Sequence, residues 1–113
     1  MISWLLNGVT MKATTKSLYE ISAMANDLLA EKYPNAHTSV GLMDKVLRKK
    51  GIPADAVTID NVDNNIRVIL ILIDNQEDTV GIGVGNTLSD DMNVLSQRPL
   101  NALTANDVFA ILE

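Results

Sequence analysis

The 113-residue chain contains no cysteine, few aromatic residues and a single histidine, His37. Without cysteine there is no disulfide, no thiolate zinc site and no cysteine nucleophile. This composition suits a reducing compartment, so we expect a cytoplasmic protein. General acid–base catalysis also lacks obvious residues, because there is one histidine and no recognised pair of acids. We therefore assign no catalytic residue and expect a protein that is not an enzyme.

A long apolar segment is also missing. The most apolar stretch, Ile66–Ile73, has eight residues, whereas a transmembrane helix needs about 18. Residues 1–6 have no basic flank and too short an apolar core for a signal peptide. We expect a soluble protein without a membrane partner, folded as a single domain over residues 1–113. Residues 1–12 are interpreted as an N-terminal extension or arm, with Met11 as an alternative start.

The net charge of −5 is unevenly distributed. Residues 1–50 carry seven basic and four acidic side chains, whereas residues 51–113 carry two basic and ten acidic ones. Such asymmetry orients encounters with a charged partner, or with a second copy, although salt screens it within about 8–10 Å. We therefore expect the charge asymmetry to orient an approaching partner more than to strengthen its binding.

Apolar residues at helical spacing predict three helices. The first covers residues 14–33 and ends at Pro34. Ser17 and Glu20 fit a capping box if the helix begins as late as Ser17. The second covers residues 39–50, with Gly51 as its C-terminal cap. The third begins at a capping box made by Thr104 and Asp107.

Alternating and apolar stretches predict three strands. Residues 57–60 alternate and are interpreted as an edge strand, residues 66–73 as a middle strand covered on both faces, and residues 79–85 as its neighbour. Turns at 63–65 and 74–78 join them. Residues 86–103 have no firm assignment, although Ser89–Asp91 suits the start of a short helix through Leu95. The fold class is α+β, in the order α-α-β-β-β-α, with a small antiparallel meander packed against helices.

Three glycines alternate along the last strand, at Gly81, Gly83 and Gly85. A five-residue turn would pair Ile71 with Gly81 and Ile69 with Gly83, whereas a change of one residue in turn length would exchange the faces. Glycine weakens a strand interior, and its usual reason there is close approach by another backbone or a ligand. That approach comes from a helix of the same chain, from a partner chain or from a small ligand.

Three strands and three helices cover both faces of a sheet only thinly, which favours a homodimer. The sequence therefore predicts a non-catalytic binding or protein-interaction module that self-associates through its sheet. The predicted ligand or partner surface consists of Gly81, Gly83, Gly85, Ile69 and Ile71.

Two alternatives stay open. The basic end of the second helix would make the protein a nucleic-acid-binding accessory, through Lys45, Arg48, Lys49 and Lys50. Five acids around the predicted hairpin would repel phosphates, which argues against this alternative. The other alternative is a small-molecule pocket, or a small enzyme, between the glycine trough and the first helix, with contributions from Tyr19, Met24 and Tyr33.

Other motifs do not assign a chemistry. The three spaced glycines lie within a strand and lack the spacing of a dinucleotide loop, and no phosphate-binding loop occurs. His37, Ser39 and Asp44 are close in sequence, but a hydrolytic triad is defined by geometry. The acidic turns do not match a calcium loop. We therefore expect no cofactor and no bound metal.

Overall fold

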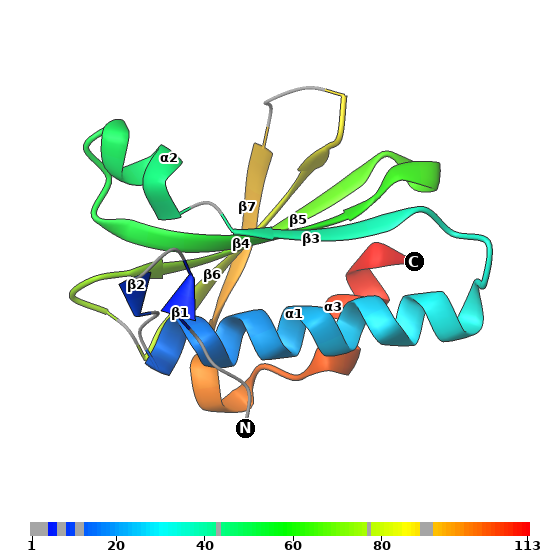
Figure 1. The fold of residues 1–113 in the computed structure, drawn as a ribbon, viewed down its shortest axis with the longest axis horizontal. Helices are drawn as coiled ribbons and strands as arrows, with labels where there is room; N and C mark the ends of the chain where they lie inside the picture. Colours follow the sequence, from blue (N-terminus) through cyan, green and yellow to red (C-terminus); the bar gives the residue numbers. More distant parts are fainter. Residues whose placement is uncertain (1–4, 7–8, 11–12, 43, 77, 89–91) are drawn as a thin grey trace.

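The computed structural model describes residues 5–6, 9–10, 13–42, 44–76, 78–88 and 92–113 (Figure 1). Two 3₁₀ turns lie at Val62–Asn64 and Leu100–Ala102. The helices and strands, in chain order, are β1 (Leu5–Leu6), β2 (Val9–Thr10), α1 (Ala13–Lys32), β3 (Thr38–Leu42), α2 (Asp44–Lys49), β4 (Ala54–Asn61), β5 (Ile66–Ile73), β6 (Thr79–Asn86), β7 (Met92–Pro99) and α3 (Ala105–Leu112).

The main sheet is an antiparallel meander of five strands in the order β3-β4-β5-β6-β7. Its middle strand is β5, as predicted for residues 66–73. The predicted order α-α-β-β-β-α was incomplete, because β3 and β7 extend the sheet on either side of the three expected strands. β1 and β2 pair with each other in a separate ribbon, and the other residues of the predicted arm lie outside the described residues.

The predicted second helix, residues 39–50, was wrong in its first half. Residues 38–42 form the edge strand β3, and only residues 44–49 are helical. Val40 lies opposite Ile59, and Leu42 opposite Val57, so both residues pair with β4 in the sheet and are not part of a helix. Gly51 adopts a φ of 81° after α2, which confirms its predicted role as the cap.

Residues 57–60 belong to an internal strand, so the predicted edge strand was wrong. β4 pairs with β3 on one side and β5 on the other, and almost all of its residues are buried. Its polar residues Thr58 and Asp60 had suggested that one face of this strand is exposed to solvent. Thr58 is in fact buried, and Asp60 accepts two hydrogen bonds from Arg67, directly opposite on β5.

The short helix considered for residues 89–95 is also not observed, because residues 92–99 form the edge strand β7. Residues 89–91 lie outside the described residues. Pro99 ends β7, which fits the confinement of proline to edge strands and strand ends. The pairing of β6 with β7 is interrupted by a bulge between Ile82 and Gly83.

α1 matches the predicted helix almost residue for residue. Its buried stripe recurs at three- and four-residue spacing and is formed by Thr15, Leu18, Ser22, Ala25 and Leu29. The predicted capping box at Ser17 was wrong, since the helix begins at Ala13 and Ser17 Oγ donates to the Ala13 carbonyl inside it.

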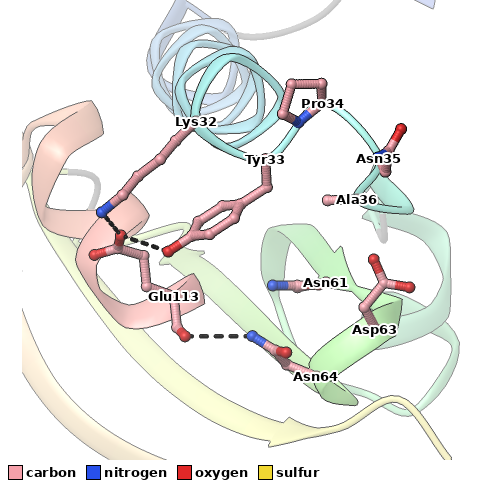
Figure 2. A pocket seen from close by; sticks show the side chains of 9 residues that line it. All are labelled: Lys32, Tyr33, Pro34, Asn35, Ala36, Asn61, Asp63, Asn64 and Glu113. Atoms are coloured by element: carbon pink, nitrogen blue, oxygen red, sulfur yellow. Dashed lines mark hydrogen bonds and ion pairs between the residues drawn. The ribbon is translucent and has the colours of Figure 1, made fainter.

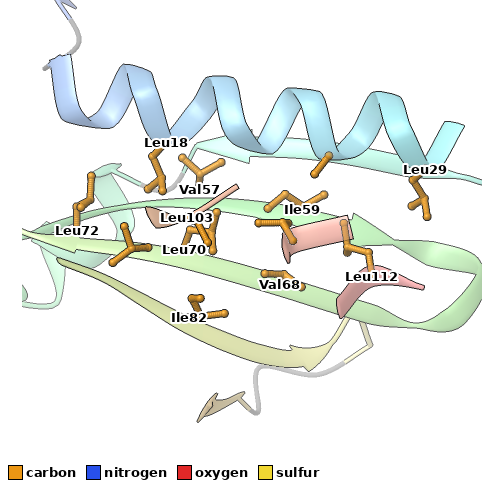
Figure 3. Close-up of a cluster of buried hydrophobic side chains, with 13 residues drawn as sticks. Leu18, Leu29, Val57, Ile59, Val68, Leu70, Leu72, Ile82, Leu103 and Leu112 are labelled. Carbon is orange, nitrogen blue, oxygen red and sulfur yellow. The ribbon is translucent and has the colours of Figure 1, made fainter. Parts of the chain in front are cut away.

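α1 and α3 pack on the same face of the sheet (Figure 1). The hydrophobic core lies between this helix layer and the inward side chains of the strands (Figure 3). Leu70 lies at its centre, opposite Val57 on β4 and Ile82 on β6, and all three are buried. Among the described residues, no helix combines the length and apolar character that crossing a membrane requires.

Ion pairs join the two halves of the chain that carry opposite charge. Lys32 pairs with Glu113, and Arg48 pairs with both Asp55 and Asp74. Part of the charge asymmetry predicted from sequence is therefore compensated within the molecule.

The predicted capping box at the start of α3 is confirmed. Thr104 Oγ1 accepts from the Asp107 amide at 3.2 Å, and Asp107 Oδ2 accepts from the Thr104 amide at 3.0 Å. That second hydrogen bond is the main reason why the pKa of Asp107 lies below its ordinary value. The carboxylate therefore stabilises the fold above its unfolded pKa, and this contribution is lost as the pH falls through the lowered folded pKa.

Replacing Thr104 with Ala should lower the free energy of unfolding at neutral pH by about 1 kcal/mol, because one helix amide loses its acceptor. Urea denaturation of the T104A variant measures this loss. T104S is the matched control, since it keeps the oxygen and should stay close to the parent protein. Equal losses in both variants would contradict the capping role.

Candidate functional site

The sheet face opposite α1 and α3 brings the predicted surface residues together. Ile69, Ile71 and Ile73 form a ridge along β5, and Gly81, Gly83 and Gly85 form a trough along β6 beside it. We call these six residues the open face. Ile71 lies opposite Gly81 and Ile69 opposite Gly83, so the register that a five-residue turn implies is the one observed.

β4 adds a second row of small side chains that the sequence interpretation missed. Ala56 lies opposite Ile71 and Thr58 opposite Ile69, on the same side of the sheet as the ridge. The isoleucine ridge is thus bordered by alanine and threonine on one side and by glycine on the other. The signal was present in the sequence, because these residues alternate at strand spacing from Ala54 onward.

Gly81 has room that its own chain does not use. A Cβ built there would meet only Ile71, with its side chain at 3.8 Å and its carbonyl oxygen at 3.9 Å, which is ordinary van der Waals contact. Gly81 is not among the residues with positive φ, so its backbone does not require glycine. Packing within the described part of the chain therefore does not explain this glycine.

Exposure varies along the ridge. Ile73 is 39% exposed, Ile71 is half-buried and Ile69 is only 7% exposed. Gly81 is half-buried, next to the exposed end of the ridge. α2 lies on this side of the sheet at one end, where it packs against β4 (Figure 1). The accessible centre of the open face is therefore formed by Ile71, Ile73 and Gly81.

The residues of the nucleic-acid alternative are partly occupied by contacts with acids. The Arg48 guanidinium donates to both carboxylate oxygens of Asp74, at 2.9 and 2.8 Å, and to Asp55 Oδ1 at 2.9 Å. These hydrogen bonds, first those to Asp74, raise the pKa of Arg48. Lys49 and Lys50 are exposed, and the side chain of Lys45 lies outside the described residues. Arg48 thus anchors α2 to the sheet.

His37 contacts an acid that the sequence interpretation did not select. Its backbone amide donates to Asp63 Oδ2 at 2.9 Å, and its ring Nδ1 lies 3.0 Å from Asp63 Oδ1. The amide hydrogen bond is the main reason why the pKa of Asp63 is lowered. Ser39 is exposed on β3, and the side chain of Asp44 lies outside the described residues.

A polar cavity of about 570 Å³ lies at the end of α1, between the α1–β3 loop and the end of α3 (Figure 2). The predicted pocket between the glycine trough and the first helix was wrong, because α1 packs on the opposite face of the sheet. Of the three residues considered for it, Tyr33 lines this cavity, Met24 lines a different groove and Tyr19 packs against the core. The side chains described show no group of three or more histidine and acidic residues suited to a metal. The cavity is lined by Lys32, Tyr33, Pro34, Asn35, Ala36, Asn61, Asp63, Asn64 and Glu113.

Comparison with protein-family models, with curated proteins and with solved structures finds no match to this chain. A function therefore has to be inferred from the chemistry of its own residues. The open face and the polar cavity are the two regions whose geometry supports such an inference.

Proposed function

We propose that the protein is a non-catalytic interaction module that self-associates through the open face. The observation that supports this most is the unused space at Gly81, beside an isoleucine ridge that is exposed at the same end. Strand glycines of this kind usually admit another backbone. α1 and α3 cover the other face (Figure 1). On this face Ile69 and Gly83 are buried, whereas Ile71, Ile73 and Gly81 keep accessible surface within the described part of the chain.

A second copy is the occupant that fits the shape of the open face. Its surface consists of a ridge of isoleucines beside a trough of glycines. Around a two-fold axis, the ridge of one copy enters the trough of the other, and the same contact forms twice. The surface is thus complementary to itself.

The size of the face suits a weak dimer. Four strands of eight residues and one of five, about 4.8 Å apart, span roughly 600 Å². Two copies that met over the whole face would therefore bury at most about 1,200 Å². That area is at the lower end of specific interfaces. We therefore expect dimers with a dissociation constant of about micromolar order, in exchange with monomers.

The test is the mass in solution of the parent protein and of the Gly81→Val variant. Valine suits a strand, and an added Cβ at Gly81 makes only ordinary contacts in the described part of the chain. In the proposed dimer the valine side chain would fill the trough. We expect G81V to fold and to raise the dimer dissociation constant by about tenfold or more, as a steric clash at an interface centre does. Light scattering across a concentration series measures both proteins.

Ser96→Val is the matched control, because Ser96 is exposed and lies opposite Ile82, on the helix side of the sheet. S96V adds the same side chain to a neighbouring strand and should dimerise as the parent protein does. A parent protein that stays monomeric, or a folded G81V that dimerises as tightly as the parent, would refute self-association through this face.

A further inference from the structure

The polar cavity already holds one ammonium group, that of Lys32. Its Nζ donates to Glu113 Oε1 and lies 5.5 Å from the centre of the Tyr33 ring and 5.7 Å from that of Phe109. Figure 2 shows the Lys32 and Tyr33 side chains converging on Glu113. A carboxylate with aromatic faces around it is the arrangement by which proteins recognise ammonium ions.

The ammonium group of Lys32 lies at the protein surface. The Lys32 side chain is 56% exposed, and ion pairs at such positions contribute little stability. Lys32 can therefore exchange its contact with Glu113 for water at small cost. The contact raises the pKa of Lys32 and lowers that of Glu113, so both groups are charged at neutral pH.

The cavity wall has a second acid and an unpaired acceptor. Asp63 brings a carboxylate whose pKa is lowered, so that the two acids outnumber Lys32. Asn61 is 4% exposed, and its Nδ2 donates to the Leu112 carbonyl. Its buried Oδ1 has no hydrogen-bond partner among the residues that the structure describes. A ligand that brings N–H donors and positive charge complements such a wall.

We propose that this cavity binds a small organic cation with a primary ammonium group, which takes the place of Lys32 against Glu113 and Tyr33. The volume of about 570 Å³ suits a small molecule. Lys32 then acts as an internal competitor that keeps affinity low. The site lies apart from the open face and does not depend on self-association.

Butylamine, which is protonated at neutral pH, is the probe, and 1-butanol is its uncharged counterpart. An NMR titration at physiological salt should give saturable shifts at residues 32–36, 61–64 and 113. The Lys32→Met variant removes the competing ammonium group but keeps an apolar side chain of similar length. Butylamine should therefore bind about fivefold more tightly, which corresponds to the free energy of one cation–π contact. Glu113→Gln should weaken binding by about tenfold, since a charge-assisted contact is lost.

Two controls separate the site from a general charge effect. Lys49→Met makes the same charge change as K32M on α2, and Glu31→Gln makes the same change as E113Q on an exposed part of α1. Both should bind as the parent protein does. The proposal is wrong if neither the parent nor K32M shows saturable shifts, if K49M tightens binding as much as K32M, or if 1-butanol binds as tightly. The same titration in G81V keeps the result independent of dimerisation.

Discussion

Replacing Leu70 with Ala should lower the free energy of unfolding by about 3 kcal/mol, within the range of about 2–5 kcal/mol for such core truncations. Leu70 is fully buried on the middle strand, and its cross-strand neighbours Val57 and Ile82 are buried as well. Strands on both sides leave little freedom for the site to close around a cavity. The loss would take a large part of the stability of a domain whose total is about 5–15 kcal/mol.

Urea denaturation of L70A measures this effect, and an unchanged slope with denaturant shows that the unfolding reaction is the same. Ile73→Ala is the matched control, because Ile73 lies on the same strand but is 39% exposed on the open face. The I73A variant should lose less than about 1.5 kcal/mol of unfolding free energy, because the Ile73 side chain buries less apolar area on folding than Leu70 does. A loss at Leu70 no larger than that at Ile73 would contradict the assignment of the two faces.

Replacing Ile71 with Lys should abolish the dimer, with an increase in the dissociation constant of about 100-fold or more. In the proposed interface Ile71 lies at the centre of the ridge, and the two-fold axis would place two lysines close together in an apolar contact. Burying an unpaired ammonium is costly, and each copy would bring one. In the monomer Ile71 is only half-buried, so the lysine ammonium can reach water along its apolar stem.

Sedimentation velocity over a concentration series, combined with circular dichroism to verify folding, tests the Ile71→Lys variant. Ser96→Lys makes the same charge change on the helix side of the sheet and should leave the dimer intact. If S96K disrupts association as strongly as I71K, net charge rather than the open face controls assembly. A folded I71K that remains dimeric would exclude the ridge from the interface.

The middle of the fold could be predicted from the sequence because its signals are local. Apart from Arg67, residues 66–73 are apolar at both alternating positions, which is typical of a strand in the middle of a sheet. The predicted cover on both faces is not observed at Ile73, which is 39% exposed. Of the two registers that the sequence left open for the pairing of residues 66–73 with β6, the structure has the one implied by a five-residue turn. The start of α3 was also predictable, since Thr104 and Asp107 form a cap at a fixed spacing.

The edges could not be predicted, because their structure depends on pairing with distant residues. Val40, Met43, Val46 and Leu47 recur at helical spacing in the sequence. Val40 nevertheless belongs to a strand, because it pairs with Ile59. Residues 92–99 join the sheet by pairing with β6. Their apolar residues Met92, Val94 and Leu95 do not alternate along the whole strand, so the sequence pattern did not indicate a strand there. Arg67 on β5 donates a hydrogen bond to Asp60 on the neighbouring strand β4. Asp60, which the sequence pattern placed on a solvent-exposed face, is therefore half-buried.

The two candidate sites differ in the same way. The glycine trough could be predicted from the sequence. Glycine weakens a strand interior, so three glycines at strand spacing indicate close approach by another backbone or a ligand. The cavity was not visible, since Lys32 and Glu113 are 81 residues apart and meet only when α1 and α3 pack side by side. Of the residues considered from the sequence for a pocket, Tyr33 lines this cavity, whereas Tyr19 and Met24 do not.

The mass of the parent protein in solution tests the central claim most directly. Sedimentation equilibrium over a range from about 1 to 300 μM brackets the weak dimer expected from the area of the open face. We predict a mass that rises with concentration from 12.3 kDa toward twice that value. A constant mass of 12.3 kDa over the whole range would contradict the proposal that the open face binds a second copy.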